Sequence, residues 1–142
     1  MSAKPSVYEF IDHTADLGII VRGPDAKGLF SNAAMAVTEL MVTGKLGQKR
    51  TIKSIFLEAE DYPDLMVRWL GEIVYLFIGD KLIMDSIEIK ALNPTRIQAA
   101  LSMADYDPKR HRVLREIKAV TYHGISVGRA NDEWEARVIF DI

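Results

Sequence analysis

The sequence predicts a single α+β domain, with two helices packed on one side of a largely antiparallel sheet. A chain of 142 residues has the usual size of one domain and can bury a continuous core. Only two stretches have apolar residues at helical spacing, and the remaining apolar stretches are rich in β-formers. The order is strand, strand, helix, strand, helix and then several strands, which is typical of α+β proteins. With no repeat or linker, the predicted domain spans residues 1–142.

The first part of the chain predicts two strands and a helix. Residues 7–11 are rich in β-formers, and residues 17–23 resemble a second strand that ends at a Gly-Pro turn. Asp25 stands where a helix N-cap belongs, and Gly44 is a natural end for the helix. The apolar residues of this helix recur at helical spacing; they are Leu29, Phe30, Ala33, Ala36, Val37, Leu40 and Met41.

The middle of the chain predicts another strand and a second helix. Residues 51–60 alternate as a strand does, and the segment Asp61-Tyr62-Pro63-Asp64 supplies a helix start. The apolar residues that follow form a wide face, so we expect this helix to be buried on much of its circumference. They are Leu65, Met66, Trp69, Leu70, Ile73, Val74, Leu76 and Phe77.

The last part of the chain is rich in β-formers. The predicted strands cover residues 83–92, 95–103, 116–127 and 134–140. Turns are predicted at Asn93-Pro94, Asp107-Pro108 and Asn131-Asp132, because these residue pairs favour chain reversal.

Composition excludes several classes of protein. The 18 Lys and Arg residues against 20 Asp and Glu give a charge of −2, so electrostatics does not favour coating of nucleic acid or an anionic membrane by the whole domain. The absence of cysteine excludes disulfides, thiolate metal sites and a Cys nucleophile. No signal-like N-terminus or bilayer-spanning apolar run is present, so we expect a cytoplasmic protein without membrane contact.

The first candidate site is the segment EFIDHTADLG, which contains Asp12, His13 and Asp16. One interpretation is a polar turn in which Asp12 and Thr14 hydrogen-bond the turning backbone. The alternatives are a metal site or half of a catalytic dyad. Taken alone, the segment favours the turn, because short Asp-rich turns are common and an adjacent Asp-His pair is not a metal motif.

The second candidate site is the closing segment VIFDI. Asp141 follows an apolar strand, and Ile142 adds an α-carboxylate whose pKa is normally about 3.5. If the last strand lies beside the first, then Asp12, Asp141 and the Ile142 carboxylate could converge. Such a cluster repels itself unless a cation neutralises it, and oxygen ligands suit Ca²⁺ or Mg²⁺ better than Zn²⁺.

The third candidate site is the segment EIKAVTYHG, in which Lys118 lies among apolar and aromatic residues. Lys118 is either an edge-strand lysine that discourages aggregation or a cation aimed at an acidic pocket or a partner's phosphate. His123 fits a structural or surface role better than a ligand role. For the basic stretch 107–115, a solvated loop is the default interpretation, and a phosphate or protein contact is the alternative.

The segments YEFIDHTADLGIIVRG, EIKAVTYHGISV and IFDI together resemble the archease family, and DLMVRWLGEIVYLF is similar to its central helix. The resemblance covers essentially the whole chain. It implies a non-catalytic activator that binds an RtcB-type RNA ligase transiently in tRNA splicing. The activator promotes guanylylation of the ligase's histidine and its multiple turnover in exon joining, without stable RNA binding of its own.

The resemblance also implies a divalent-cation site made by acids from both chain ends. Carried over to this sequence, the ligands are Asp12, Asp141 and Ile142, and the cation is Ca²⁺, with Mg²⁺ or Mn²⁺ as alternatives. Lys118 is expected to be a further functional cation, and Asp16 and His13 to have supporting roles.

Two other functions compete with this interpretation. A small metal-dependent hydrolase or nucleotide-binding enzyme could use Asp12, His13 and Asp141. Against it, the sequence has no Gly-rich phosphate loop, HExxH or GxSxG motif and no convincing pairing of a base with a nucleophile. A plain RNA-binding module is disfavoured by the net charge and by the absence of an aromatic-basic stripe.

Overall fold

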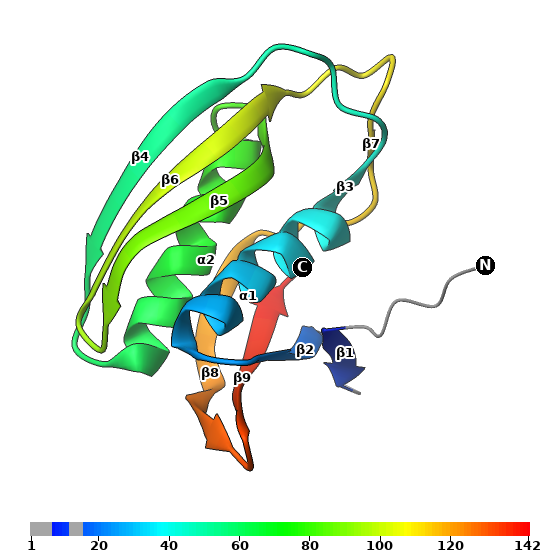
Figure 1. Cartoon of the computed structure of the whole chain (residues 1–142). Helices are drawn as coiled ribbons and strands as arrows, with labels where there is room; N and C mark the ends of the chain where they lie inside the picture. Colours follow the sequence, from blue (N-terminus) through cyan, green and yellow to red (C-terminus); the bar gives the residue numbers. More distant parts are fainter. Residues whose placement is uncertain (1–6, 12–15) are drawn as a thin grey trace.

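The computed structural model describes residues 7–11 and 16–142 and contains two helices among antiparallel strands (Figure 1). Helix α1 spans Ala26–Met41 and helix α2 spans Tyr62–Ile78. All strand pairs in the described part are antiparallel. The predicted α+β class is therefore confirmed.

The largest sheet brings the two ends of the chain together. Its members are β1 (Tyr8–Ile11), β2 (Leu17–Gly23), β8 (Ala119–Ala130) and β9 (Glu133–Asp141). They are ordered β1-β2-β9-β8, so the last strand lies beside the second strand and the first strand is one position further out.

A second sheet of three strands comes from the middle of the chain. Its order is β4-β6-β5, with β4 at Thr51–Glu58, β5 at Leu82–Asn93 and β6 at Arg96–Asp105. Two short strands, β3 (Val42–Thr43) and β7 (Arg112–Val113), pair with each other and were not expected from the sequence.

Both helices contact both larger sheets. Helix α1 packs on β2 and β5, and helix α2 packs on β8, β5 and β4. Helix α2 can do this because its buried residues surround much of the helix, as predicted; they are Leu65, Met66, Val67, Trp69, Leu70, Ile73, Val74, Leu76 and Phe77. The sequence did not show that the strands divide between two larger sheets. No helix in the described part is long and apolar enough to cross a membrane.

The predicted helix starts are confirmed by side-chain caps. The Asp25 carboxylate accepts a hydrogen bond from the Gly28 N–H (2.7 Å), and Asp61 accepts one from the Asp64 N–H (2.9 Å). Each cap satisfies one backbone N–H that the first helical turn leaves without a partner.

The basic stretch 107–115 is not a wholly solvated loop, so that expectation is corrected. His111 is buried, with 5% exposure. Its Nδ1 accepts the Asp107 N–H (2.9 Å), and its Nε2 lies 2.9 Å from the carbonyl oxygen of Lys45. The contact with Lys45 holds the stretch to the segment that follows β3, whereas the Asp107 bond lies within the stretch. Strand β7 also lies within the stretch.

Candidate functional site

Strand register brings the opening, third and closing segments to one end of the largest sheet. Leu17 pairs with Phe140 across β2 and β9, and Ala119 pairs with Asp141 across β8 and β9. The Lys118 N–H donates a hydrogen bond to the Asp141 carbonyl oxygen (2.8 Å). Three segments that are far apart in the sequence are therefore neighbours at this end of the sheet.

Two acidic residues, Asp16 and Asp141, lie at this end of the sheet. Phe140 is fully buried toward the helices, so the next residue, Asp141, lies on the opposite face, where it is exposed. Half-buried Asp16 directly precedes β2, whose pairing with β9 ends at Leu17 and Phe140. Both acids therefore adjoin the Leu17–Phe140 pair, with Asp141 on the outer face.

The other predicted site residues have different placements. Lys118 precedes β8, and its exposed side chain lines a pocket beside α2. Ile142 follows β9 and is 45% exposed. Asp12 and His13 lie outside the described residues.

The oxygen chemistry of this end suits a hard cation. Asp16 and Asp141 offer carboxylate oxygens, which Ca²⁺ and Mg²⁺ prefer. Within the described part of the chain, the Asp141 carboxylate forms no ion pair, so no basic side chain there neutralises its charge by direct contact. Among residues 7–11 and 16–142, no three Asp, Glu, His or Cys side chains form a metal-binding group.

The pocket beside α2 combines apolar walls with cations, and we call it the basic-rimmed pocket. Its volume is about 330 Å³. It is lined by Phe77, Ile78, Lys81, Tyr106, Val113, Arg115, Glu116, Ile117 and Lys118. Because Lys118 lines the pocket and is bonded to Asp141 through its backbone, the pocket borders the carboxylate end of the sheet.

A hydrogen bond between Tyr122 and Asp64 was missed by the sequence analysis. The Tyr122 hydroxyl donates to the Asp64 carboxylate over 2.6 Å, and this carboxylate also accepts the Glu60 N–H (3.0 Å) and Arg68 Nε (3.1 Å). The Tyr122 bond is the main cause that lowers the pKa of Asp64, and the same bond raises the pKa of Tyr122. No sequence pattern indicates this pairing, because the residues are 58 positions apart.

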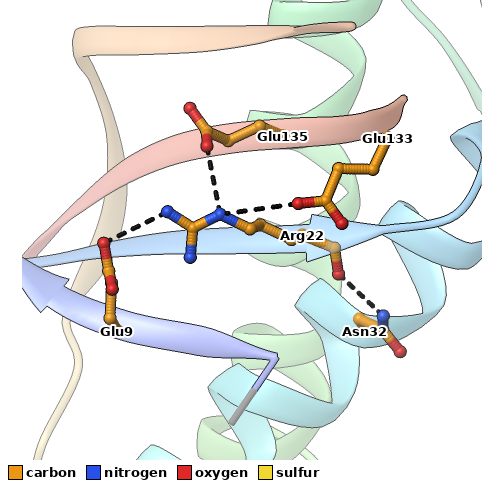
Figure 2. A network of polar contacts seen from close by, with 5 residues as sticks. All are labelled: Glu9, Arg22, Asn32, Glu133 and Glu135. Carbon is orange, nitrogen blue, oxygen red and sulfur yellow. Dashed lines mark hydrogen bonds and ion pairs between the residues drawn. The ribbon is translucent and has the colours of Figure 1, made fainter. Parts of the chain in front are cut away.

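An ionic cluster on the outer face joins β1, β2 and β9 (Figure 2). Arg22 contacts Glu9 and Glu135 at 3.2 Å each and lies 3.9 Å from Glu133. The hydrogen bond to Glu9 is the largest cause that raises the pKa of Arg22. The Arg22 carbonyl oxygen accepts a hydrogen bond from Asn32 of α1 (2.8 Å). The cluster thus holds β1, the strand directly before the DHTAD segment (residues 12–16), on the sheet.

Comparisons with known proteins match nearly the whole chain to one protein family. The model of the Archease protein family (MTH1598/TM1083) matches residues 8–142. Protein archease of Methanosarcina acetivorans is 33% identical over 147 residues, and that of Methanosarcina barkeri is 33% identical over 146 residues; in both cases all of each chain is covered.

Two solved structures are also similar. The solution structure of Methanobacterium thermoautotrophicum protein 1598 has a TM-score of 0.70 and 28% identity, over 97% of this chain and 100% of the other. The crystal structure of an archease from Thermotoga maritima, named a possible chaperone, has a TM-score of 0.65 over 100% and 98% of the two chains. At 21% identity, the second likeness shows the fold alone.

Proposed function

The chain belongs to the archease family, and from this premise we propose that it is a non-catalytic activator of an RtcB-type RNA ligase in tRNA splicing. In this role the protein promotes guanylylation of the ligase's histidine and so supports multiple turnover in exon joining. The proposal places this activity in the cytoplasm.

One observation carries the proposal. The three segments on which the family resemblance rests occupy neighbouring strands at one end of the largest sheet, where Leu17 pairs with Phe140 and Ala119 with Asp141. Acids from the two chain ends can form one site only if both ends contribute to the same surface, and this end of the sheet is such a surface. It is also solvent-accessible at Asp141 and Ile142, so a partner can reach it.

We propose that Asp12, Asp141 and the α-carboxylate of Ile142 hold a divalent cation, Ca²⁺ in the first instance and Mg²⁺ or Mn²⁺ as alternatives. The exposed Asp141 carboxylate, which forms no ion pair in the described part of the chain, supports this donor set. When bound, the cation supplies positive charge that stabilises a phosphate or a departing pyrophosphate. The chain's own part is to orient the carboxylates through the β2–β9–β8 pairing and to present Lys118 beside them.

A multiple-turnover ligation assay tests the function. The RtcB-type ligase is mixed with tRNA exon halves, nucleotide and metal, with and without this protein. We expect ligation beyond one product per ligase only when the protein is present. An unchanged ligation yield would refute the activator role. Nucleotide hydrolysis by the protein alone would support the alternative function of a metal-dependent enzyme. Tight RNA binding without the ligase would support the alternative function of an RNA-binding module.

A further inference from the structure

The basic-rimmed pocket, which shares Lys118 with the carboxylate end of the sheet, has the size and the lining of a binding site. Its volume of about 330 Å³ lies at the lower end of the range for ligand pockets. Phe77 and Ile117 form buried parts of its wall. The Tyr106 ring lies edge-on to the Phe77 ring, with 5.7 Å between centroids, so the wall includes two aromatic rings.

The charge around the pocket is positive although the chain as a whole carries −2. Lys81, Arg115 and Lys118 line it together with one carboxylate, that of Glu116. Within the described part of the chain, the ammonium groups of Lys81 and Lys118 form no ion pair. Neither ammonium group is paired within the described part of the chain, and the three cations outnumber the one carboxylate, so an anionic ligand would supply the missing partners.

Arg115 is held in place and so fixes one side of the pocket. Its Nη1 donates to the Leu40 carbonyl oxygen (3.2 Å), and its guanidinium lies 5.5 Å from the centroid of the Phe10 ring. The pocket wall is thereby connected to the end of α1 and to β1.

Apolar surface at the pocket extends into solvent. Ile78 is 47% exposed and Val113 is 40% exposed, and both line the pocket. Exposed apolar area bordered by charged groups is typical of a surface that another protein covers. A single-stranded nucleic acid would instead need exposed aromatic faces on which its bases stack, whereas Phe77 in this wall is only 8% exposed.

We propose that the basic-rimmed pocket binds an acidic segment of a partner protein, with one large apolar side chain of that segment inserted between Phe77, Tyr106 and Ile117. Lys81 and Lys118 pair with the acidic residues on either side of the inserted side chain. A buried apolar anchor flanked by charge pairs is a common form of protein recognition, in which the anchor supplies most of the affinity. This proposal is independent of the proposed ligase activation. It concerns binding of a peptide to this chain alone, which is measured without the ligase.

The test is an NMR titration of the full ¹⁵N-labelled chain with a capped pentapeptide. The peptide has a central phenylalanine with two acidic residues on each side. We expect saturable amide shifts centred on Lys81, Tyr106 and Ile117. A peptide with alanine at its centre should bind about tenfold more weakly, because the apolar anchor is lost. A peptide with lysines in place of the acids should not bind there.

Lys81 offers a variant that removes charge without disturbing the backbone. Lys81 has φ 57°, a left-handed conformation that asparagine adopts more readily than lysine. Lys81→Asn should therefore fold normally and weaken the acidic peptide about threefold, the effect of one exposed ion pair. Lys27→Asn removes an exposed lysine of α1 that does not line the pocket, and it should leave peptide affinity unchanged.

Several results would overturn the proposal. These are the absence of shifts at the pocket, equal affinity for the phenylalanine and alanine peptides, and an equal effect of Lys81→Asn and Lys27→Asn. Shifts of the same pocket amides by a single-stranded RNA decamer but not by the acidic peptide would assign the pocket to RNA instead.

Discussion

At the scale of single residues, the Tyr122–Asp64 hydrogen bond links the middle of β8 to the first turn of α2. Three donors surround the Asp64 carboxylate, and its side chain is only 13% exposed. The ionised form of Asp64 is therefore favoured in the folded state, and so is the neutral form of Tyr122. The bond connects the third candidate segment to the helix layer.

Tyr122→Phe should lower the free energy of unfolding by about 1 kcal/mol at neutral pH, because one hydrogen bond is lost. The contribution of Asp64 is present above its unfolded pKa of about 3.9 and is lost as pH falls through its lowered folded pKa. The contribution of Tyr122 is present below about pH 10 and is lost as pH rises through its raised folded pKa. Urea unfolding across pH measures both limits.

Tyr75→Phe is the matched control, because Tyr75 is 59% exposed and its hydroxyl has no hydrogen bond within the described part. We expect this control to leave stability unchanged at every pH. A difference between wild type and Tyr122→Phe that stays constant from acid to alkaline pH would contradict the pKa assignments.

Gly44 and Gly71 should respond to alanine in opposite directions. Gly44 has φ 127°, and a Cβ there would overlap the carbonyl oxygen of Arg110, so Gly44→Ala should destabilise by about 1–3 kcal/mol. A Cβ at Gly71 in α2 meets nothing within 4 Å, so Gly71→Ala should stabilise by about 0.5–1 kcal/mol. Thermal unfolding of both variants checks this, and a stabilised Gly44→Ala would refute the close approach.

At the scale of helices and strands, local signals predicted the helices better than the sheets. Asp25 and Asp61 act as the predicted caps, since an N-cap needs only residues within one turn. Strand 83–92 was expected close to its observed range. The division into two larger sheets was not predicted, because strand partners are set by contacts far apart in the chain. Strand β7 was missed because two residues carry too little pattern.

Attachment of β1 should depend on the charge of Arg22. Arg22→Met should lower the free energy of unfolding by up to about 1 kcal/mol at low salt, because the cluster with Glu9 and Glu135 is partly exposed. High salt should reduce the difference, since ions screen exposed pairs. Arg137→Met is the control: Arg137 is exposed on β9 and has no ion pair in the described part. Urea unfolding at low and high salt compares them.

An equal salt effect for Arg22→Met and Arg137→Met would contradict this role of the cluster. A hydrogen-exchange comparison adds a local readout. Amides of β1, such as that of Phe10, should exchange faster in Arg22→Met than in the control, because Glu9 loses its partner.

At the scale of the whole molecule, the site is an outcome of topology. The sequence predicted acids at both chain ends and left their meeting conditional on the first and last strands being neighbours. In the structure the last strand lies beside β2 and β1 is one strand further out, so the first and last strands are not neighbours. The sequence indicates Lys118 as a candidate functional residue. Its place in the basic-rimmed pocket could not be predicted, because the pocket forms only where α2 packs beside β8.

The rate of guanylylation of the ligase's histidine tests the central claim most directly. It is measured with wild-type protein, Asp12→Asn, Asp141→Asn and the control Asp132→Asn, which changes an exposed carboxylate in the turn between β8 and β9. We predict that Asp12→Asn and Asp141→Asn each reduce the stimulation at least about tenfold, as loss of a metal ligand should. Asp132→Asn should stimulate as wild type does. Equal stimulation by all four proteins would contradict an activator that works through the carboxylates at its chain ends.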